Sequence, residues 1–568
     1  MASFFSKDSI IAPPGFNRWR VPPASIAIHL CIGSVYAWSV FNSPLERVLG
    51  VAVSAPDDWT FSQTNGIYMT ALVCLGLSAA VAGKWMERVG PRAVATVAAL
   101  CWAVGFWLGG LGIQTHQLWL LYLGYGGVGG IGLGLGYVSP VSTLIRWFPD
   151  RRGLATGMAI MGFGGGAMLG APLKESLMSK FYIAPDRLGS VADWQPFTEQ
   201  GRRYVLVDER PVEVVEVGAN ELAGQIQLPG VYVVGSGSTG VAATFYLLGA
   251  LYLVIMLPAA LSYRLPAPDW RPAGWSPESA RSSNRQMIST GHVGIDQALR
   301  TPQFYLLWLM LCLNVTAGIG MIGAAKTIVK DIFRGPLPEI VTDRFAATYV
   351  LMISVSNMLG RFVWAGLSDR LGRKTIYMVF FILGNILYLA IPGCAQGVSA
   401  RPAAGWLIAF YLVTMLIVSM YGGGFATIPA YLADLFGTRF VGGIHGRLLT
   451  AWSTAAVIGT MSLAALREQS RRQAIADLAA KIAPTDFAAK FGAEVSQLPA
   501  LIQQKLVTIP KLLELAPVGT PDPSGTLYNS TMYLMAGLLG IATIANWFVR
   551  PVAAKHHLQD VSASGLAP

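Results

Sequence analysis

The stretch RFAATYVLMISVSNMLGRFVWAGLSDRLGRK, residues 344–374, decides the fold. Its apolar part is roughly 20 residues long, enough for a helix to cross a bilayer, and it ends in a basic turn. Arg361 precedes Asp369, at the membrane exit, by eight residues or about 12 Å of helix. An arginine at this depth costs roughly 2.5–3.5 kcal/mol and is usually retained because it faces a polar cavity or pathway. The stretch therefore predicts a membrane helix with a functional arginine; the alternative is a guanidinium that snorkels to the surface or pairs with a carbonyl for structure alone.

The composition is that of a membrane protein. The 568 residues are 53% hydrophobic and 12% charged, whereas soluble domains carry about 25% charged residues. The net charge is +11, but the basic residues cluster beside apolar runs, so we expect the lipid bilayer and no nucleic acid as a partner. The five cysteines include no CxxC pair, and the six histidines show no ligand spacing beyond His556 and His557. We therefore expect no disulfide framework, metal or other cofactor.

About twelve apolar segments have the length of a membrane span. They are 24–43, 64–83, 92–112, 117–146, 152–172, 241–262, 303–326, 345–367, 374–392, 404–424, 443–465 and 529–549. With a cytoplasmic N-terminus, most lysines and arginines of the short loops fall on the inner side, as the positive-inside rule requires. We expect both termini to be cytoplasmic and the protein to lie in a bacterial inner membrane.

Two pairs of motifs indicate an internal repeat. GKWMERVGPR (83–92) and AGLSDRLGRK (365–374) share an acid-Arg-x-Gly-x-base pattern and lie 282 positions apart. The segments 140–153 and 429–442 each begin with proline and end with glycine, and they lie 289 positions apart. Two motif pairs at nearly one offset favour duplicated six-helix halves. The acid of each turn can pair with a neighbouring helix end and latch the cytoplasmic side shut; the gating residues predicted here are Glu87, Arg88, Asp369 and Arg370.

The expected fold is an all-α membrane protein of twelve helices in two pseudo-symmetric halves with two extra-membrane insertions. The other expected parts are 1–172 and 241–264 (N-terminal half), 265–300 (cytoplasmic linker), 301–465 and 529–550 (C-terminal half) and 551–568 (cytoplasmic tail). Insertion 173–240 alternates with period two, which suggests strands, whereas insertion 466–528 has helical spacing. We expect both insertions on the periplasmic side. There they either form a cap over the outer opening of the helix bundle or have no part in its function.

Glycine runs occur in the fourth and fifth spans, as GYGGVGGIGLGLGYVSP and GFGGGAMLG. A dinucleotide-binding loop needs a preceding strand in a soluble βαβ unit, and neither is visible. Small residues instead allow membrane helices to approach closely, which is the interpretation adopted here.

Four passages occur in order on the expected spans: GSVYAWSVF (33–41), GLGLGYVSPVSTLIRWFPDRRGLATGMAIMGFGGGA (132–167), LRTPQFYLLW (299–308) and YGGGFATIPAYLADLFGTRFVGGIHGRLLTAW (421–452). Together they resemble the major facilitator superfamily and, within it, the oxalate/formate antiporter family, a relative of the monocarboxylate transporters. The resemblance covers both membrane halves and excludes the insertions. It implies a secondary carrier of small organic anions that works by alternating access, as an exchanger or a proton-linked carrier.

The resemblance also implies a substrate site. Arg361, which follows Asn357 by one helical turn, would hold a substrate carboxylate, and a guanidinium offers the planar two-donor fork that suits this role. The aromatic residues that line the site in this family correspond to Tyr36, Tyr137, Tyr421 and Phe425. Their alternative role is ordinary helix packing.

One departure from the family concerns the substrate. Oxalate exchangers of this family carry a lysine after Thr-Ala in the eleventh span, whereas this chain has Trp452. A dianion beside one arginine would keep an uncompensated charge in a low-dielectric site, which is costly. We therefore expect a monocarboxylate such as formate, lactate or pyruvate, or a larger carboxylate whose apolar part stacks on Trp452; a dicarboxylate such as oxalate is the alternative. Lys326, near the outer end of its span, is expected to snorkel.

A second departure concerns coupling. Proton-linked monocarboxylate transporters carry an aspartate where this chain has Asn357, which does not titrate. His29 in the first span is the nearest candidate for a proton relay, and its alternative is a hydrogen-bonded packing role. The coupling partner is therefore either a proton or a counter-anion, and the sequence does not distinguish between them.

Two other functions are compatible with these residues. A membrane sensor would bind a carboxylate and signal through the caps without moving it, but it has no need of turn motifs in both halves. An intramembrane enzyme needs a nucleophile–base or metal constellation, and the sequence shows none, so we expect no enzymatic activity. The carrier architecture works as one chain, so a monomer is expected.

Overall fold

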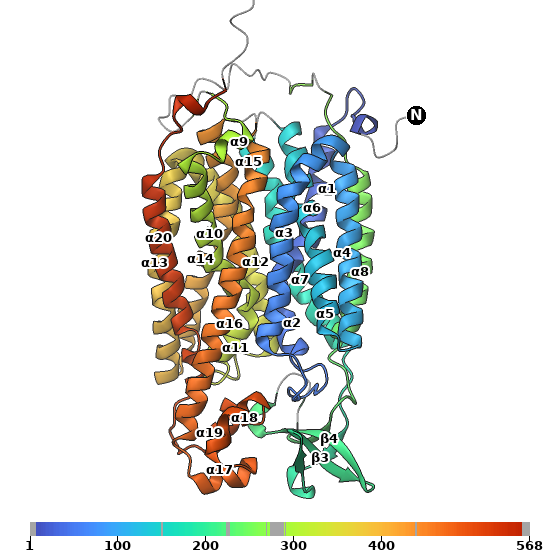
Figure 1. Cartoon of the computed structure of the whole chain (residues 1–568), viewed down its shortest axis with the longest axis vertical. Helices are drawn as coiled ribbons and strands as arrows, with labels where there is room; N and C mark the ends of the chain where they lie inside the picture. The colour runs from blue at the N-terminus through green and yellow to red at the C-terminus, as the bar shows by residue number, and fades with distance from the viewer. Residues whose placement is uncertain are drawn as a thin grey trace, which may run out of the picture.

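A bundle of long helices carries a small sheet and several short helices at one end, as the computed structural model in Figure 1 shows. The structure describes residues 7–148, 152–222, 226, 228–267, 270–272, 289, 291–437 and 440–558. We call the end that carries the sheet and the short helices the cap end, and the opposite end, where the described chain begins, the terminal end. The long helices run between these two ends.

Ten helices of the described chain, some built from two or three segments, are long and apolar enough to cross a bilayer. They are α3 (Phe61–Val89), α4 (Pro91–Gln114), α5 (Leu118–Leu121) with a π-helical turn (Tyr122–Gly129) and α6 (Gly130–Trp147), α8 (Val241–Leu261), α10 (Pro302–Gly323), α12 (Asp343–Leu371), α13 (Arg373–Ala400), α14 (Ala404–Phe436), α15 (Val441–Leu448) with α16 (Thr450–Ala479), and α20 (Asn529–Phe548). An eleventh span is broken, because α1 (Val21–Gly33), with the 3-10 segments at its two ends (Arg18–Arg20 and Ser34–Ala37), is bent by 47° from α2 (Ser39–Leu45). The glycine-rich α7 (Arg152–Lys180) lies where the fifth of the expected spans falls, and it is not one of the ten or eleven spans counted above.

The two repeated turns have the same backbone form. Gly90 joins α3 to α4 and Gly372 joins α12 to α13, each with a φ of +88°, a conformation that only glycine adopts without strain. The side chain of Asp369 pairs with Arg373, which also lies 3.6 Å from Asp434 of α14. Two further predicted gating residues, Arg88 and Arg370, are exposed at the terminal end, and the side chain of Glu87 lies outside the described residues.

Two helices run further than their apolar parts predict. Helix α7 continues through the expected boundary at residue 172 to Lys180, and α16 continues past residue 465 to Ala479. In α16, Glu468 accepts from Arg471 and Arg472 at 2.9 and 2.8 Å, and such pairs one turn apart support a helix in water. Hydropathy thus marks where the apolar part stops, and the helix itself continues.

Each insertion has its own secondary structure. The first holds a five-stranded antiparallel sheet in the order β1-β5-β4-β3-β2, with β1 Arg187–Gly189, β2 Phe197–Glu199, β3 Arg202–Val207, β4 Arg210–Val217 and β5 Gly230–Val233. The second holds α17 (Pro484–Phe491), α18 (Leu498–Gln503) and α19 (Ile509–Leu515). Two short helices also lie outside the spans, α9 (Ile295–Ala298) at the terminal end and α11 (Ala325–Phe333) at the cap end.

The two insertions touch each other across the junction of the halves. Glu221 of the sheet insertion accepts a 3.0 Å hydrogen bond from Thr508, beside α19. Arg334, which follows α11, donates to the carbonyl oxygen of Leu222 at 3.1 Å. Lys505 donates to the hydroxyl of Ser54, in the loop before α3, at 2.9 Å. The cap is therefore one layer built from both halves.

Within the bundle, the halves meet along two helix pairs, α7 with α12 and α3 with α16. Ser354 of α12 donates to the carbonyl oxygen of Gly164 in α7 at 2.8 Å. Ser453 of α16 donates to the carbonyl oxygen of Val73 in α3, also at 2.8 Å. Small residues and residues with a hydroxyl group at these contacts let the helices of the two halves approach each other closely. The centre of the junction is therefore formed by these faces of the four helices.

Helices α12 and α14 approach most closely at Gly360, where an added Cβ would overlap the carbonyl oxygen of Ser419. We expect Gly360→Ala to lower the unfolding temperature of the whole chain by several degrees, because the helices must separate to admit the methyl group. Gly366→Ala in the same helix is the control, since a Cβ there meets nothing within 4 Å. Equal unfolding temperatures for the two variants in a thermal scan would contradict this.

Candidate functional site

Arg361 lies in the middle of α12, fully buried, and reaches from its own half into the other. Its Nε donates to the side-chain oxygen of Asn357 at 3.0 Å. Its Nη1 donates to the carbonyl oxygen of Ile160 in α7 at 3.3 Å, across the junction. The remaining nitrogen, Nη2, is buried without a hydrogen-bond partner among the described residues. The fork is therefore held in place on two sides and has a donor to offer on the third.

Two glycines make room for this arginine. A Cβ at Gly164 of α7 would lie 2.7 Å from Nε of Arg361, and a Cβ at Gly422 of α14 would overlap the carbonyl oxygen of Asn357. The glycine runs of the fifth and tenth spans thus form the slot in which the guanidinium lies. This is the close-packing role expected of small residues in membrane helices.

Six aromatic side chains surround the guanidinium. Phe163 and Phe425 present their rings 5.9 and 5.4 Å from its central carbon, within the range of cation–π attraction. The ring of Trp452 lies 4.4 Å from that of Phe425. We call this set the aromatic cage: Tyr36, Tyr137, Phe163, Tyr421, Phe425 and Trp452, drawn from α7, α6, α14, α16 and the turn between α1 and α2.

The cage carries hydrogen-bond donors. The hydroxyls of Tyr36 and Tyr421 bond to each other at 2.9 Å across the junction of the halves. The indole N–H of Trp452 and Nη2 of Arg361 are buried without a hydrogen-bond partner of good geometry among the described residues, and the hydroxyl of Tyr137 lies beside the guanidinium. Burying a donor without a good partner costs roughly 1–3 kcal/mol, so these donors together are a costly arrangement for packing alone. An anion would satisfy all three kinds of donor.

All seven residues predicted to contact substrate, Arg361, Asn357, Tyr36, Tyr137, Tyr421, Phe425 and Trp452, lie in this one cluster. His29, the predicted proton relay, lies behind it. Its ring stacks on Tyr137 at 5.4 Å, and its two nitrogens face the carbonyl oxygens of Ala159 and Tyr137. A neutral imidazole has only one N–H to donate to these two acceptors.

Two residues near the site were not predicted from the sequence. Phe163, a cage residue, is the single aromatic residue in the run GFGGGA. Lys174 of α7 is fully buried. The ammonium group donates to the carbonyl oxygens of Ser34 and Ala37, at 2.7 and 3.4 Å, in the broken first span. Lys174 thereby stabilises the turn that presents Tyr36 to the cage.

The prediction that Lys326 snorkels to the surface is wrong. Lys326 is only 6% exposed and forms an ion pair with Glu175 of α7, which joins the two halves. The reason is that α11 lies over the end of the bundle, so the side chain points into the junction and not into solvent. A cation and an acid 151 residues apart gave no sign of pairing in the linear sequence.

The cluster offers one permanent cation, neutral donors and apolar ring faces, which together fit a carboxylate with a small apolar body. Across the residues that the structure describes, no group of three or more His, Cys, Asp or Glu side chains is arranged to hold a metal ion.

Comparison with known proteins gives the same family as the sequence motifs. Residues 25–185 and 223–460 match the family model described as Major Facilitator Superfamily. The oxalate:formate antiporter of Oxalobacter formigenes is 23% identical over 78% of this chain and 83% of its own length. Apicoplast pyruvate carrier 1 of Toxoplasma gondii is 23% identical over 74% of this chain and 78% of its own length. The crystal structure of a bacterial homologue of the human lysosomal transporter Spinster shares the fold, with a TM-score of 0.55, 15% identity and coverage of 94% of this chain and 97% of that one.

Proposed function

Because the chain belongs to the major facilitator superfamily, a family of membrane transporters, we propose that it is a secondary carrier of small organic monocarboxylates. The observation that carries this proposal is the buried guanidinium of Arg361, whose Nη2 is left to bind a ligand inside an otherwise uncharged aromatic cage. A carboxylate would accept from Nη2 and from the hydroxyl of Tyr137, while its carbon atoms contact the rings of Phe163 and Trp452.

A single negative charge fits this site better than two. The six cage side chains are uncharged, so the second carboxylate of a dianion would meet no opposite charge there, and an unpaired buried charge is costly. The named substrates of two relatives, pyruvate for one and oxalate and formate for the other, support a small carboxylate without choosing among them.

Alternating access follows from where the cluster lies. Helices α7 and α12 come from opposite halves and both contribute to the site, so rocking the halves apart at one end exposes it to that side. The pair Lys326–Glu175 and the cap hold the halves together at the cap end, whereas the ion pair of Asp369 with Arg373 lies within the C-terminal half. Under the positive-inside rule, the terminal end is in the cytoplasm and the cap end faces the periplasm of a bacterial cell. One chain contains both halves, so the proposed carrier is a monomer.

The experiment that tests the function is counterflow in proteoliposomes. Vesicles loaded with unlabelled lactate, pyruvate or formate should accumulate the same labelled anion, and oxalate-loaded vesicles should accumulate far less labelled oxalate. Faster oxalate counterflow would replace the proposal by a dicarboxylate carrier. Binding of these anions without counterflow would replace it by a carboxylate sensor.

The position of Asn357 predicts how the charge of Arg361 can be cancelled. We expect Asn357→Asp to reduce uptake severalfold, because a carboxylate beside Nε of Arg361 competes with the substrate anion. The adjacent guanidinium favours the charged form of the new carboxylate, so the loss of uptake should persist from pH 8 down to about pH 5. Uptake by Asn357→Ala at the same pH values is the control; equal uptake by Asn357→Asp and Asn357→Ala would contradict the prediction.

A further inference from the structure

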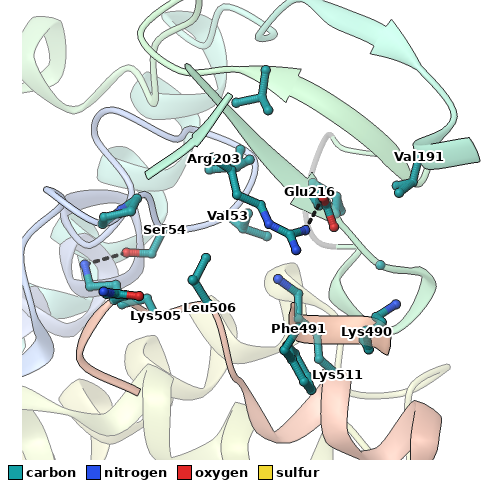
Figure 2. Close-up of a pocket in the computed structure, with 16 residues that line it drawn as sticks. Val53, Ser54, Val191, Arg203, Glu216, Lys490, Phe491, Lys505, Leu506 and Lys511 are labelled. Carbon is teal, nitrogen blue, oxygen red and sulfur yellow. Dashed lines mark hydrogen bonds and ion pairs between the residues drawn. The ribbon is translucent and has the colours of Figure 1, made fainter. Parts of the chain in front are cut away.

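A pocket of about 60 Å³ lies in the cap, between the sheet insertion and the helical insertion. Figure 2 shows its two sides, with Arg203 and Glu216 on the strands and Lys490, Lys505 and Lys511 on the helical side. A single water needs roughly 10–15 Å³ on this measure, so the pocket has room for several non-hydrogen atoms. It is separate from the aromatic cage, which lies in the middle of the bundle.

The pocket is basic. Four cations line it, Arg203, Lys490, Lys505 and Lys511, against one carboxylate, Glu216. They come from both halves of the molecule, since Arg203 lies on β3 and the three lysines follow α16. Cations of this density around a partly enclosed space attract anions and raise their local concentration.

Three of these cations have a carboxylate partner, but the pairs leave some of their donors unused. Arg203 pairs with Glu216 through Nη1, but its Nε is buried without a partner among the described residues. Lys511 lies 3.8 Å from Glu221, which is longer than a hydrogen bond. Lys490 has a closer carboxylate, Glu514 at 3.2 Å.

Lys505 donates to three neutral oxygens, the Ser54 hydroxyl at 2.9 Å, the Ala55 carbonyl at 3.2 Å and the Asp58 carbonyl, and the nearby Asp58 carboxylate favours its charged form. Burial lowers the pKa of Lys505, which is the expected effect of removing a cation from water. An anion in the pocket would offset this cost.

The other walls are apolar. Val53, Val215, Leu506 and Phe491 line the pocket between the cations. Apolar walls with a few charged groups are typical of sites for small organic molecules, so this lining suits a carboxylate attached to a short carbon chain.

We propose that this cap pocket is a second binding site, which captures a small organic anion before it reaches the aromatic cage. The inference rests on the proposed function for one point only, that the anion belongs to the class of substrate carried. Because both halves line the pocket, its shape changes when they separate at the cap end, and the anion is released next to the opening.

The test is pyruvate binding to the full-length protein in nanodiscs, measured by calorimetry. The variant Arg361→Ala removes the main cation of the cage, and we expect it to keep one class of site whose affinity falls about fivefold or more between 20 and 300 mM salt. Adding Arg203→Gln and Lys511→Gln should abolish this class. Arg210→Gln with Lys481→Gln, on exposed positions of the same two insertions, is the matched control.

The pocket can also be tested by replacing the side-chain amide of one lining residue with a carboxylate of the same size. Gln504 lines the pocket, whereas Gln503 is its exposed neighbour outside it. In the Arg361→Ala background, Gln504→Glu should weaken pyruvate binding about tenfold by charge repulsion, and Gln503→Glu should leave it within twofold.

The possible outcomes separate the two proposals. Loss of all pyruvate binding in Arg361→Ala, or equal effects of the two glutamine variants, overturns the cap site and leaves the carrier proposal standing. Pyruvate binding that depends on Arg203 and Lys511, in a protein that shows no counterflow of any monocarboxylate, supports the cap site and overturns the carrier proposal.

Discussion

Replacing Arg361 by lysine is expected to reduce monocarboxylate uptake about 100-fold or more while the protein remains folded. The guanidinium places Nε on Asn357, Nη1 on Ile160 and Nη2 toward the substrate, whereas the three N–H donors of a lysine ammonium all lie on one nitrogen and cannot reach three positions this far apart. Each lost hydrogen bond to a charged group costs roughly 1.5–3 kcal/mol, a factor of about 13 to 160 in binding, so the loss of two exceeds 100-fold. Uptake of labelled lactate or pyruvate into proteoliposomes measures the change.

The matched control is Arg344→Lys, an exposed position near the start of the same helix α12. It should leave uptake within twofold of wild type, because its charge is far from the cage and well solvated. Similar uptake in Arg361→Lys and Arg344→Lys would mean that Arg361 serves packing alone, and the proposed site would have to be abandoned.

The second large effect is a change of selectivity in Trp452→Lys. This ring is fully buried, contacts Tyr137, Phe163 and Phe425, and offers an indole N–H without a partner among the described residues. A lysine here would place a second cation in the cage and make room for a second carboxylate. We expect the ratio of oxalate to lactate uptake to rise at least about tenfold, since each buried charge pair contributes 1.4 kcal/mol or more to the preference.

Trp452→Met serves as the control, because it removes the ring without adding charge. It should lower uptake of every substrate and leave the ratio of oxalate to lactate unchanged. A ratio that rises equally in both variants would show that ring size, and not charge, excludes dianions.

The sequence predicted the fold and the membership of the central cluster, and particular residues explain why. Arg361 was visible because a charge inside an apolar segment is rare, and Gly90 and Gly372 were visible because a turn with positive φ needs glycine in both halves. The aromatic residues came from the family motifs, which are fixed to specific spans. Phe163 escaped because a phenylalanine in an apolar helix carries no signal of its own until its neighbours in space are known.

Other features have no linear signature. Lys174 and Glu175 follow the expected end of their span, so they were assigned to a loop, although α7 continues through them. The pairing of Glu175 with Lys326 depends on the fold of α11 over the junction, and the cap pocket depends on two insertions that meet only in the assembled molecule. Such contacts between distant segments are decided by tertiary packing.

The two-part cap also sets a thermodynamic bias on the whole cycle. Opening the cap end must break at least the bonds Thr508–Glu221, Arg334–Leu222 and Lys505–Ser54. At roughly 0.5–1.5 kcal/mol net for each, these three favour the closed cap by about 1.5–4.5 kcal/mol, or a population ratio of about ten to two thousand. For the proposed carrier, this bias predicts that nearly all molecules at rest have a closed cap end, and that opening of the cap limits uptake from this side more than the encounter with substrate does.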